Sequence, residues 1–178
     1  LAEAEHEVWL DARRREITAL DHARGVSQAL RSVDSLQELT RSVVHHLPGL
    51  GIRRFFMATF EPEASAPTAS ARIVVAYRGN RVDESVTGLV YRSAGLLPAD
   101  LAGELAGGVL VLQPLRVGRF QHGFMLYDQP VSHAVAGDAL RRDVSACLDG
   151  MARRHELARE QDAVQHVVVS RTRRLTVE

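Results

Sequence analysis

The sequence contains no lysine, so all 22 of its basic residues are arginine. They are balanced by 22 acidic residues, which leaves the chain with no formal net charge at pH 7. Domains that bind nucleic acid usually carry a basic excess on one face, so this balance disfavours direct contact with nucleic acid. The arginine bias is typical of a GC-rich genome and does not by itself indicate an arginine-specific recognition surface.

Cysteine, aromatic residues and long apolar runs are also scarce. The single cysteine, Cys147, cannot form an internal disulfide, which fits a reducing, cytoplasmic setting. Aromatic residues make up 5% of the chain, and no apolar run approaches the roughly 18 residues that span a bilayer. We therefore expect a cytoplasmic chain without a membrane partner. Because it begins without Met and inside a helical pattern, we also expect a piece of a longer protein.

Helical patterns fill the first 47 residues. Residues 2–32 contain no proline, and they interleave charged with apolar residues at roughly helical spacing. Ser35 followed by Glu38 makes a capping box, with Asp34 as a competing N-cap, and predicts a second helix over residues 36–47. The apolar face of that helix is predicted to hold Leu36, Leu39, Val43 and Leu47.

A β-sheet is predicted between residues 52 and 127. Pro48 and Gly49 end the second helix, and residues 52–60 follow as a strand that is apolar on both faces. Such a strand is expected in the centre of a sheet that is covered on both sides. Ile52, Phe56, Ala58 and Phe60 are predicted to project to one face, and Phe55 and Met57 to the other. Further strands are predicted at residues 71–77, 89–91, 109–115 and 120–127.

From about residue 132 to the end, the chain is predicted to be helical again. Leu140, Val144, Cys147 and Met151 follow one another in steps of four, three and four residues, which is the spacing of a coiled-coil seam. We expect them to form a seam between two copies of the chain, to which Leu20, Val26 and Leu30 contribute from the first helix. A continuous helix would be about 70 Å long, so its end should project from the domain.

The histidines and the cysteine offer little chemistry. His45 and His46 point about 100° apart on a helix and cannot chelate one ion, so we interpret them as the positively charged end of the second helix. Cys147 is interpreted as a small buried hydrophobe. His122 alternates with Phe124 along a strand and is either a ligand contact or a satisfied core histidine. No metal-ligand spacing, nucleophile elbow or glycine-rich phosphate loop is present in the sequence.

Four stretches of the sequence resemble a known family. They read SLQELTRSVVHHLPGLGIRRFFMATFEP, ARIVVAYRG, LLPADLAGELAGGVLVLQPLRVGRFQHGFMLYDQ and ALRRDVSACLDGMARRHEL. In these stretches, and in the order of its helices and hairpins, the chain resembles a GAF domain over about residues 21–157. The resemblance is to a subgroup found in bacterial multidomain signalling proteins, beside LacI-type, histidine kinase or GGDEF modules.

The resemblance implies an α+β fold related to PAS domains. Its antiparallel sheet would have five or six strands, with helices on one face and a possible ligand cavity on the other. The resemblance also implies parallel homodimers held by long N- and C-terminal helices. It divides the chain into a linker and dimerisation helix (1–33), a GAF-like domain (34–157) and a signalling helix (158–178) that leads to an output domain.

The sequence thus favours a regulatory sensor or relay module that is not an enzyme and needs no cofactor. Such a module would dimerise through its terminal helices and transmit a conformational change to an output domain, for instance in transcription regulation. The alternative is a small-molecule receptor, with Phe56, Tyr91, His122 and Phe124 lining the cavity. Residues 78–108, which build the lid in GAF domains, are short for enclosing a nucleotide or a tetrapyrrole. An enzyme of the sulfoxide-reducing GAF type is disfavoured, because its chemistry uses reactive cysteines.

Overall fold

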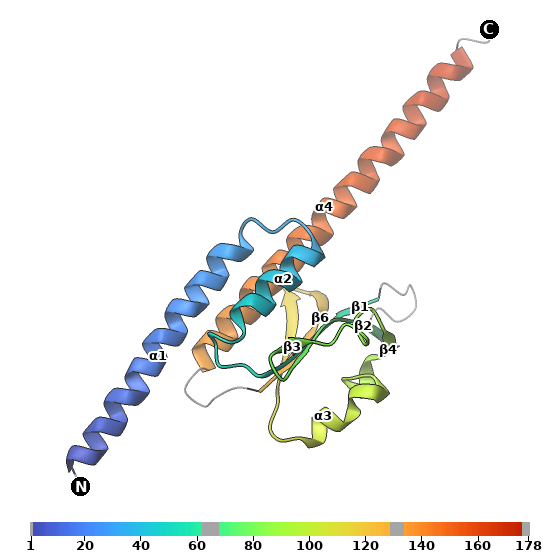
Figure 1. Cartoon of the computed structure of the whole chain (residues 1–178). Coiled ribbons are helices and arrows are strands. Elements are labelled where there is room, and N and C mark those ends of the chain that lie inside the picture. The colour runs from blue at the N-terminus through green and yellow to red at the C-terminus, as the bar shows by residue number, and fades with distance from the viewer. Residues whose placement is uncertain (1, 62–67, 129–133, 176–178) are drawn as a thin grey trace.

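A long helix at each end of the chain frames a six-stranded antiparallel sheet in the computed structural model (Figure 1). The structure describes residues 2–61, 68–128 and 134–175. Helices α1 (Ala2–Leu30) and α4 (Ala134–Leu175) run in the same direction. Helix α1 extends beyond the sheet at its N-terminal end, and α4 extends beyond it at its C-terminal end (Figure 1). The prediction of an α+β fold with long terminal helices is confirmed.

Strand β1 lies in the centre of the sheet, as its two apolar faces predicted. It pairs with β2 on one side and with β6 on the other, and both pairings are antiparallel. The strand order is β3-β2-β1-β6-β5, and β4 pairs with the start of β2. The bounds are β1 (Arg54–Phe60), β2 (Ser70–Arg78), β3 (Arg81–Val82), β4 (Val90–Arg92), β5 (Val111–Val117) and β6 (Phe120–Tyr127). All differ from the predicted bounds by one or two residues or not at all, except β3, which has only two residues and was not predicted.

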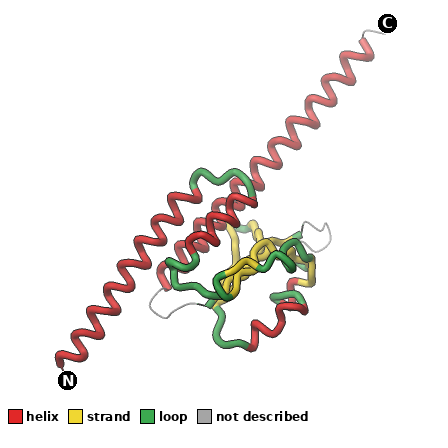
Figure 2. The backbone as a smooth tube through the Cα atoms, viewed as in Figure 1, coloured by secondary structure: helices red, strands yellow, loops and turns green. Residues whose placement is uncertain are grey.

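Different helices cover the two faces of the sheet (Figure 2). Helices α2 (Leu36–His46) and α4 pack on one face, with α1 against them. The short helices η1 (Ser93–Gly95), η2 (Ala99–Leu101) and α3 (Ala102–Ala106) lie on the other side of the sheet. The helix-face core includes Val26, Leu39, Val43, Ile52, Phe55, Met57, Val75, Tyr127, Leu140 and Val144. The distal core includes Phe56, Ala58, Ile73, Ala76, Val86, Leu97, Leu101, Phe124 and Leu126.

The start of α2 and its apolar face largely agree with the prediction from the sequence. The Ser35 hydroxyl accepts the backbone N–H of Glu38 at 3.2 Å, and the Glu38 carboxylate accepts the N–H of Asp34 at 3.1 Å. Leu39 and Val43 are fully buried, as expected, but Leu36 is 39% exposed and lies outside the core. Ile52 was wrongly assigned to the same face as Phe56. It precedes the first residue of β1 and packs in the helix-face core instead.

Two β-bulges interrupt the alternation of side chains. In β2, Met57 pairs with Val75 and Ala58 with Ile73, so Val74 is the extra residue and packs beside Val75 on the helix face. A second bulge lies in β6, where Leu115 pairs with Gly123 and Arg116 with Gln121. The residue left over is His122. Because a bulge re-aims the side chain that it inserts, His122 leaves the face predicted from simple alternation.

Helix α4 is 42 residues long, which corresponds to about 63 Å at 1.5 Å per residue. From residue 136 to residue 151, most side chains of α4 are buried or half-buried. From residue 152 to residue 163, they are exposed. The predicted start of this helix near residue 132 lies outside the described residues. None of the described helices is both long enough and apolar enough to cross a membrane.

Candidate functional site

The residues predicted to form a seam between two chains lie mostly inside one chain. Val26, Leu140 and Val144 are at most 1% exposed, and Leu30 is 5% exposed. They pack α1 and α4 against each other and against the sheet. This part of the predicted intermolecular seam is wrong, because these side chains have no surface left for a second copy. Cys147 and Met151 are half-buried at the edge of the same core, and Leu20 is half-buried on α1.

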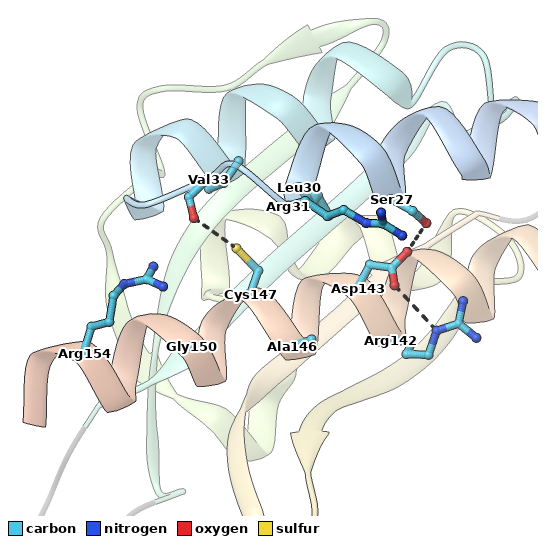
Figure 3. Close-up of a pocket in the computed structure, with 10 residues that line it drawn as sticks. All are labelled: Ser27, Leu30, Arg31, Val33, Arg142, Asp143, Ala146, Cys147, Gly150 and Arg154. Carbon is cyan, nitrogen blue, oxygen red and sulfur yellow. Dashed lines mark hydrogen bonds and ion pairs between the residues drawn. The ribbon is translucent and has the colours of Figure 1, made fainter. Parts of the chain in front are cut away.

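A trough between α1 and α4 is where the predicted seam reaches the surface (Figure 3). It has a volume of about 500 Å³, and its apolar floor includes Leu30, Val33 and Cys147. Two small residues of α4, Ala146 and Gly150, also line it. Small side chains leave the helix backbone accessible to close approach by another element.

Charged side chains flank the floor of the trough (Figure 3). Asp143 accepts a hydrogen bond from the Ser27 hydroxyl, and its carboxylate lies 3.5 Å from Nε of Arg142. At the other end, Arg154 lies 3.4 Å from the carboxylate of Asp34. The two acidic side chains beside the trough, Asp143 and Asp34, thus have hydroxyl or arginine partners within the chain.

Cys147 is a thiol rather than a reactive thiolate. Its Sγ lies 3.9 Å from the backbone oxygen of Val33. Burial raises the pKa of this thiol, and the nearby positive charge of Arg154 opposes the shift without cancelling it. The nucleophilic form is therefore disfavoured at neutral pH, in agreement with the interpretation of Cys147 as a packed side chain.

A groove on the distal face of the sheet is the second candidate site. It has a volume of about 450 Å³ and lies between β5, β6 and the segment around η1. Its polar contributors include Ser93 and Gln121, and no charged side chain of the described residues lines it. The ring centroids of Phe60 and Phe124 are 5.9 Å apart. The apolar lining consists of Phe60, Leu96, Leu112, Pro114 and Phe124, with Ala94 at the edge.

Of the four residues predicted to line a ligand cavity, one lines this groove. Phe124 does so, whereas Phe56 is 1% exposed and lies beneath the surface in the distal core. Tyr91 packs against the distal core, and its hydroxyl donates to the Leu96 oxygen at 2.9 Å. Burial raises the pKa of Tyr91, so the phenol stays protonated and able to donate. Tyr91 thus positions a wall of the groove.

Of the two predicted roles of His122, the contact with the ligand cavity is wrong, and its position agrees with a satisfied histidine. The β6 bulge turns it to the helix side, where its Nε2 lies 3.2 Å from Oδ1 of Asp149 on α4. The other carboxylate oxygen of Asp149 accepts from Nε of Arg153 at 2.8 Å. Sequence reasoning missed Asp149, although its spacing of four residues from Arg153 was a usable sign of a helical ion pair.

His45 and His46 lie in the last turn of α2, as predicted. Their rings are 5.0 Å apart and nearly perpendicular, so they do not converge on one ion. Burial lowers the pKa of His46, and the neighbouring His45 and His22 lower it further. Among the side chains that the structure describes, no three His, Cys, Asp or Glu residues are grouped so as to hold a metal ion.

No model of a known protein family matches this sequence, and no curated protein does. Solved structures match by shape. The GAF domain of a phosphoenolpyruvate-protein phosphotransferase from Coxiella burnetii has a TM-score of 0.59 at 13% identity, covering 79% of this chain and 98% of that one. The phycocyanobilin-bound GAF domain of a cyanobacterial phytochrome has a TM-score of 0.56 at 12% identity, covering 77% and 97%.

A third structure comes from another kind of signalling protein. Residues 122 to 287 of a methyl-accepting chemotaxis protein give a TM-score of 0.52 at 16% identity, covering 74% of this chain and 98% of that one. At such low identity the likeness is one of fold alone. The order of strands, the helices on one face and the long terminal helices are therefore those of the GAF fold.

Proposed function

We propose that this chain is a regulatory relay module that dimerises through its terminal helices and passes a conformational signal to an output domain. The observation that carries the proposal is the path of α4. Its first half packs on the sheet core, and residues 150–175 continue beyond it for about 39 Å. A rigid helix that is anchored in a folded core and projects from it converts a small shift at the core into a displacement at its end.

Exposed apolar side chains support a dimer. On the projecting half of α1, Val8 is 71% exposed, Trp9 57% and Ile17 53%, and no other described element of the chain covers them. On the projecting half of α4, Leu157 is 57% exposed. A second copy aligned in parallel would cover these residues and the trough together, because all of them lie on the two long parallel helices.

Light scattering on the purified chain at tens of micromolar tests the dimer. We expect twice the chain mass for the unaltered protein and the single mass for the double variant Trp9→Glu with Ile17→Glu. Val109→Glu is the matched control, since Val109 is 87% exposed and lies outside the two long helices, before β5. A monomeric unaltered chain would contradict the proposal, and so would a double variant that keeps the dimer mass.

A second candidate function is a small-molecule receptor, which the distal groove favours. A bilin attached through a cysteine does not fit this groove. The only cysteine, Cys147, packs against the helix-face core and therefore lies across the sheet from it. An uncharged ligand of modest size fits better, because the described lining has no charge to offset the desolvation of an ionic group.

A thermal-shift screen against uncharged compounds of modest size, with cyclic nucleotides, amino acids and haem as charged comparators, tests the receptor, together with mass spectrometry of ligands that co-purify. Under this proposal an uncharged compound raises the melting temperature, and Leu112→Trp, which fills the groove, removes the rise. The absence of any stabilising or co-purifying compound would count against a receptor and leave the relay without a ligand. Sulfoxide reduction is disfavoured in either form, because burial raises the pKa of Cys147 and disfavours its nucleophilic thiolate.

A further inference from the structure

The bulge in β6 touches both sides of the sheet. Gln121, Gly123 and Phe124 line the distal groove. Between them, His122 has no pairing partner on β5, and its side chain points to the opposite side of the sheet. A displacement of this short stretch therefore acts on both faces, and at His122 it is not restrained by pairing with β5.

On the helix side, the bulge meets α4 at the point where that helix leaves the domain. His122 Nε2 lies 3.2 Å from Asp149 Oδ1, and the two side chains are 14% and 11% exposed. Asp149 is the last fully buried residue among the described part of α4, because residues 150 and 151 are half-buried and residues 152–163 are exposed. The contact between His122 and Asp149 thus lies near the end of the part of α4 that packs on the sheet, where Met151 is the next residue packed against the helix-face core.

The surroundings favour movement on one side of the bulge and resist it on the other. A Cβ at Gly123 would lie 1.9 Å from the Ala58 oxygen, so the bulge is pressed directly against β1. Toward the projecting part of α4, by contrast, a side cleft of about 870 Å³ is lined by Gln121, His122 and His155. Close packing cannot absorb a displacement, so a shift of the bulge is directed toward α4 and the side cleft.

Arg153 keeps the buried carboxylate of Asp149 paired when the contact between His122 and Asp149 breaks. It lies on α4 itself and holds Asp149 Oδ2 at 2.8 Å, so it moves together with the carboxylate. A buried carboxylate that lost its only partner would strongly oppose such a change. With Arg153 in place, α4 can be held by His122 or released from it while the charge of Asp149 remains paired.

We propose that the β6 bulge is a joint that couples the distal groove to α4, with His122 and Asp149 as its positioning residues. A ligand in the groove displaces Gln121, Gly123 and Phe124, His122 moves with them, and α4 is released at Asp149. This inference rests on the proposed receptor and relay functions, and it assigns the direction in which they communicate. It requires no second copy of the chain, because every contact of the joint lies within one protomer.

The test fills the groove from within and measures hydrogen–deuterium exchange along α4. Ala94→Trp places a large ring at the groove, and Ala102→Trp is the matched control at an exposed residue that does not line it. We expect Ala94→Trp to speed exchange of the α4 amides around residues 149–160 about tenfold, the loss that corresponds to one hydrogen bond to a charged group. Ala102→Trp should leave these amides unchanged.

The same experiment in His122 variants tests whether the effect on α4 passes through the contact between His122 and Asp149. His122→Leu removes the hydrogen-bond partner, so it should speed α4 exchange by itself and leave nothing further for Ala94→Trp to add. His122→Gln keeps an amide donor and should retain a response to Ala94→Trp. If Ala94→Trp acts equally in the His122→Leu background, or has no effect on α4 in any background, the joint is overturned. Light scattering reports on the dimer independently, so failure of the joint and failure of the relay are distinguishable.

Discussion

The two faces of the sheet bury apolar side chains by different means. On the helix face, Phe55 and Tyr127 lie 6.2 Å apart between ring centroids and are completely covered by helices of 11 residues or more. On the distal face, Phe56 and Leu101 are just as buried, but their cover is built from helices of three to five residues joined by turns. On the helix face the hollows lie beside the long helices, in the trough and the side cleft, whereas the groove of the distal face lies directly on the sheet strands β5 and β6.

The two covers should differ in the free energy that their local opening requires. Long helices that pack along their length open only with most of the domain, whereas short elements held by a few contacts open locally at a lower free energy. The distal cover has such contacts in the hydrogen bond from Tyr91 to Leu96 and in the ion pairs of Glu104. We infer that the helix face supplies most of the stability, while the distal face can admit a ligand without unfolding.

The largest expected effect comes from a charge placed in the helix-face core. Val144→Glu buries a carboxylate in a position that is 0% exposed, and we expect a loss of about 4 kcal/mol or more in the free energy of unfolding. Circular dichroism during chemical denaturation measures the loss. Ala152→Glu, at an exposed position of the same helix, should change stability by no more than about 0.5 kcal/mol. If Val144→Glu keeps its fold and loses only the dimer, Val144 belongs to an intermolecular seam and not to the core of one chain.

Two neighbouring phenylalanines compare the faces directly. Phe55→Ala and Phe56→Ala each remove a buried ring, and each should cost about 3–5 kcal/mol of global stability. The local consequences should differ, because the rings lie on opposite sides of the sheet. Hydrogen–deuterium exchange should rise mainly in α2 and α4 for Phe55→Ala and mainly in residues 86–101 for Phe56→Ala. Identical exchange maps would show that the two faces open as one unit.

The sequence predicted the features that depend on short-range patterns. Phe55, Phe56 and Met57 made β1 apolar on both faces, and this placed it correctly in the centre of the sheet. Ser35 and Glu38 fixed the start of α2 through a local hydrogen bond. The two bulges were not predictable in this way, because the residues around Val74 and His122 also fit an uninterrupted strand. As a result, His122 was assigned to the wrong face.

The predicted seam failed for a different reason. Leu140 and Val144 have the spacing of helix–helix packing, and they do pack between helices, but the partners are α1 and the core of the same chain. Periodicity specifies which face of a helix is buried and not what buries it. Only the fold distinguishes these residues from Trp9 and Ile17, which remain exposed on the same bundle of helices.

A smaller effect is expected where the two faces meet at the β6 bulge. Gly123→Ala would bring a Cβ to 1.9 Å from the Ala58 oxygen, so backbone must shift, and we expect a loss of about 3 kcal/mol. Gly103→Ala in α3 is the control, since an added Cβ meets nothing within 4 Å and alanine favours a helix by up to about 1 kcal/mol. Thermal and chemical unfolding measure both. Equal stability of Gly123→Ala and the unaltered chain would mean that the bulge is not pressed against β1.

The smallest effect concerns the cover of the distal face. Glu104 of α3 lies 3.8 Å from Nη1 of Arg54 and 3.3 Å from Nη1 of Arg78, so it ties α3 to β1 and β2. Glu104→Gln removes the charge from partly exposed pairs, and global stability should fall by about 1 kcal/mol or less. Exchange should nevertheless rise in residues 96–108 and stay constant in α4, because only the distal cover loses its tie. Asp21→Asn removes an exposed pair with Arg24 on α1 and should change neither region. If Glu104→Gln speeds exchange in α4 as much as in α3, the distal cover does not open separately from the helix face.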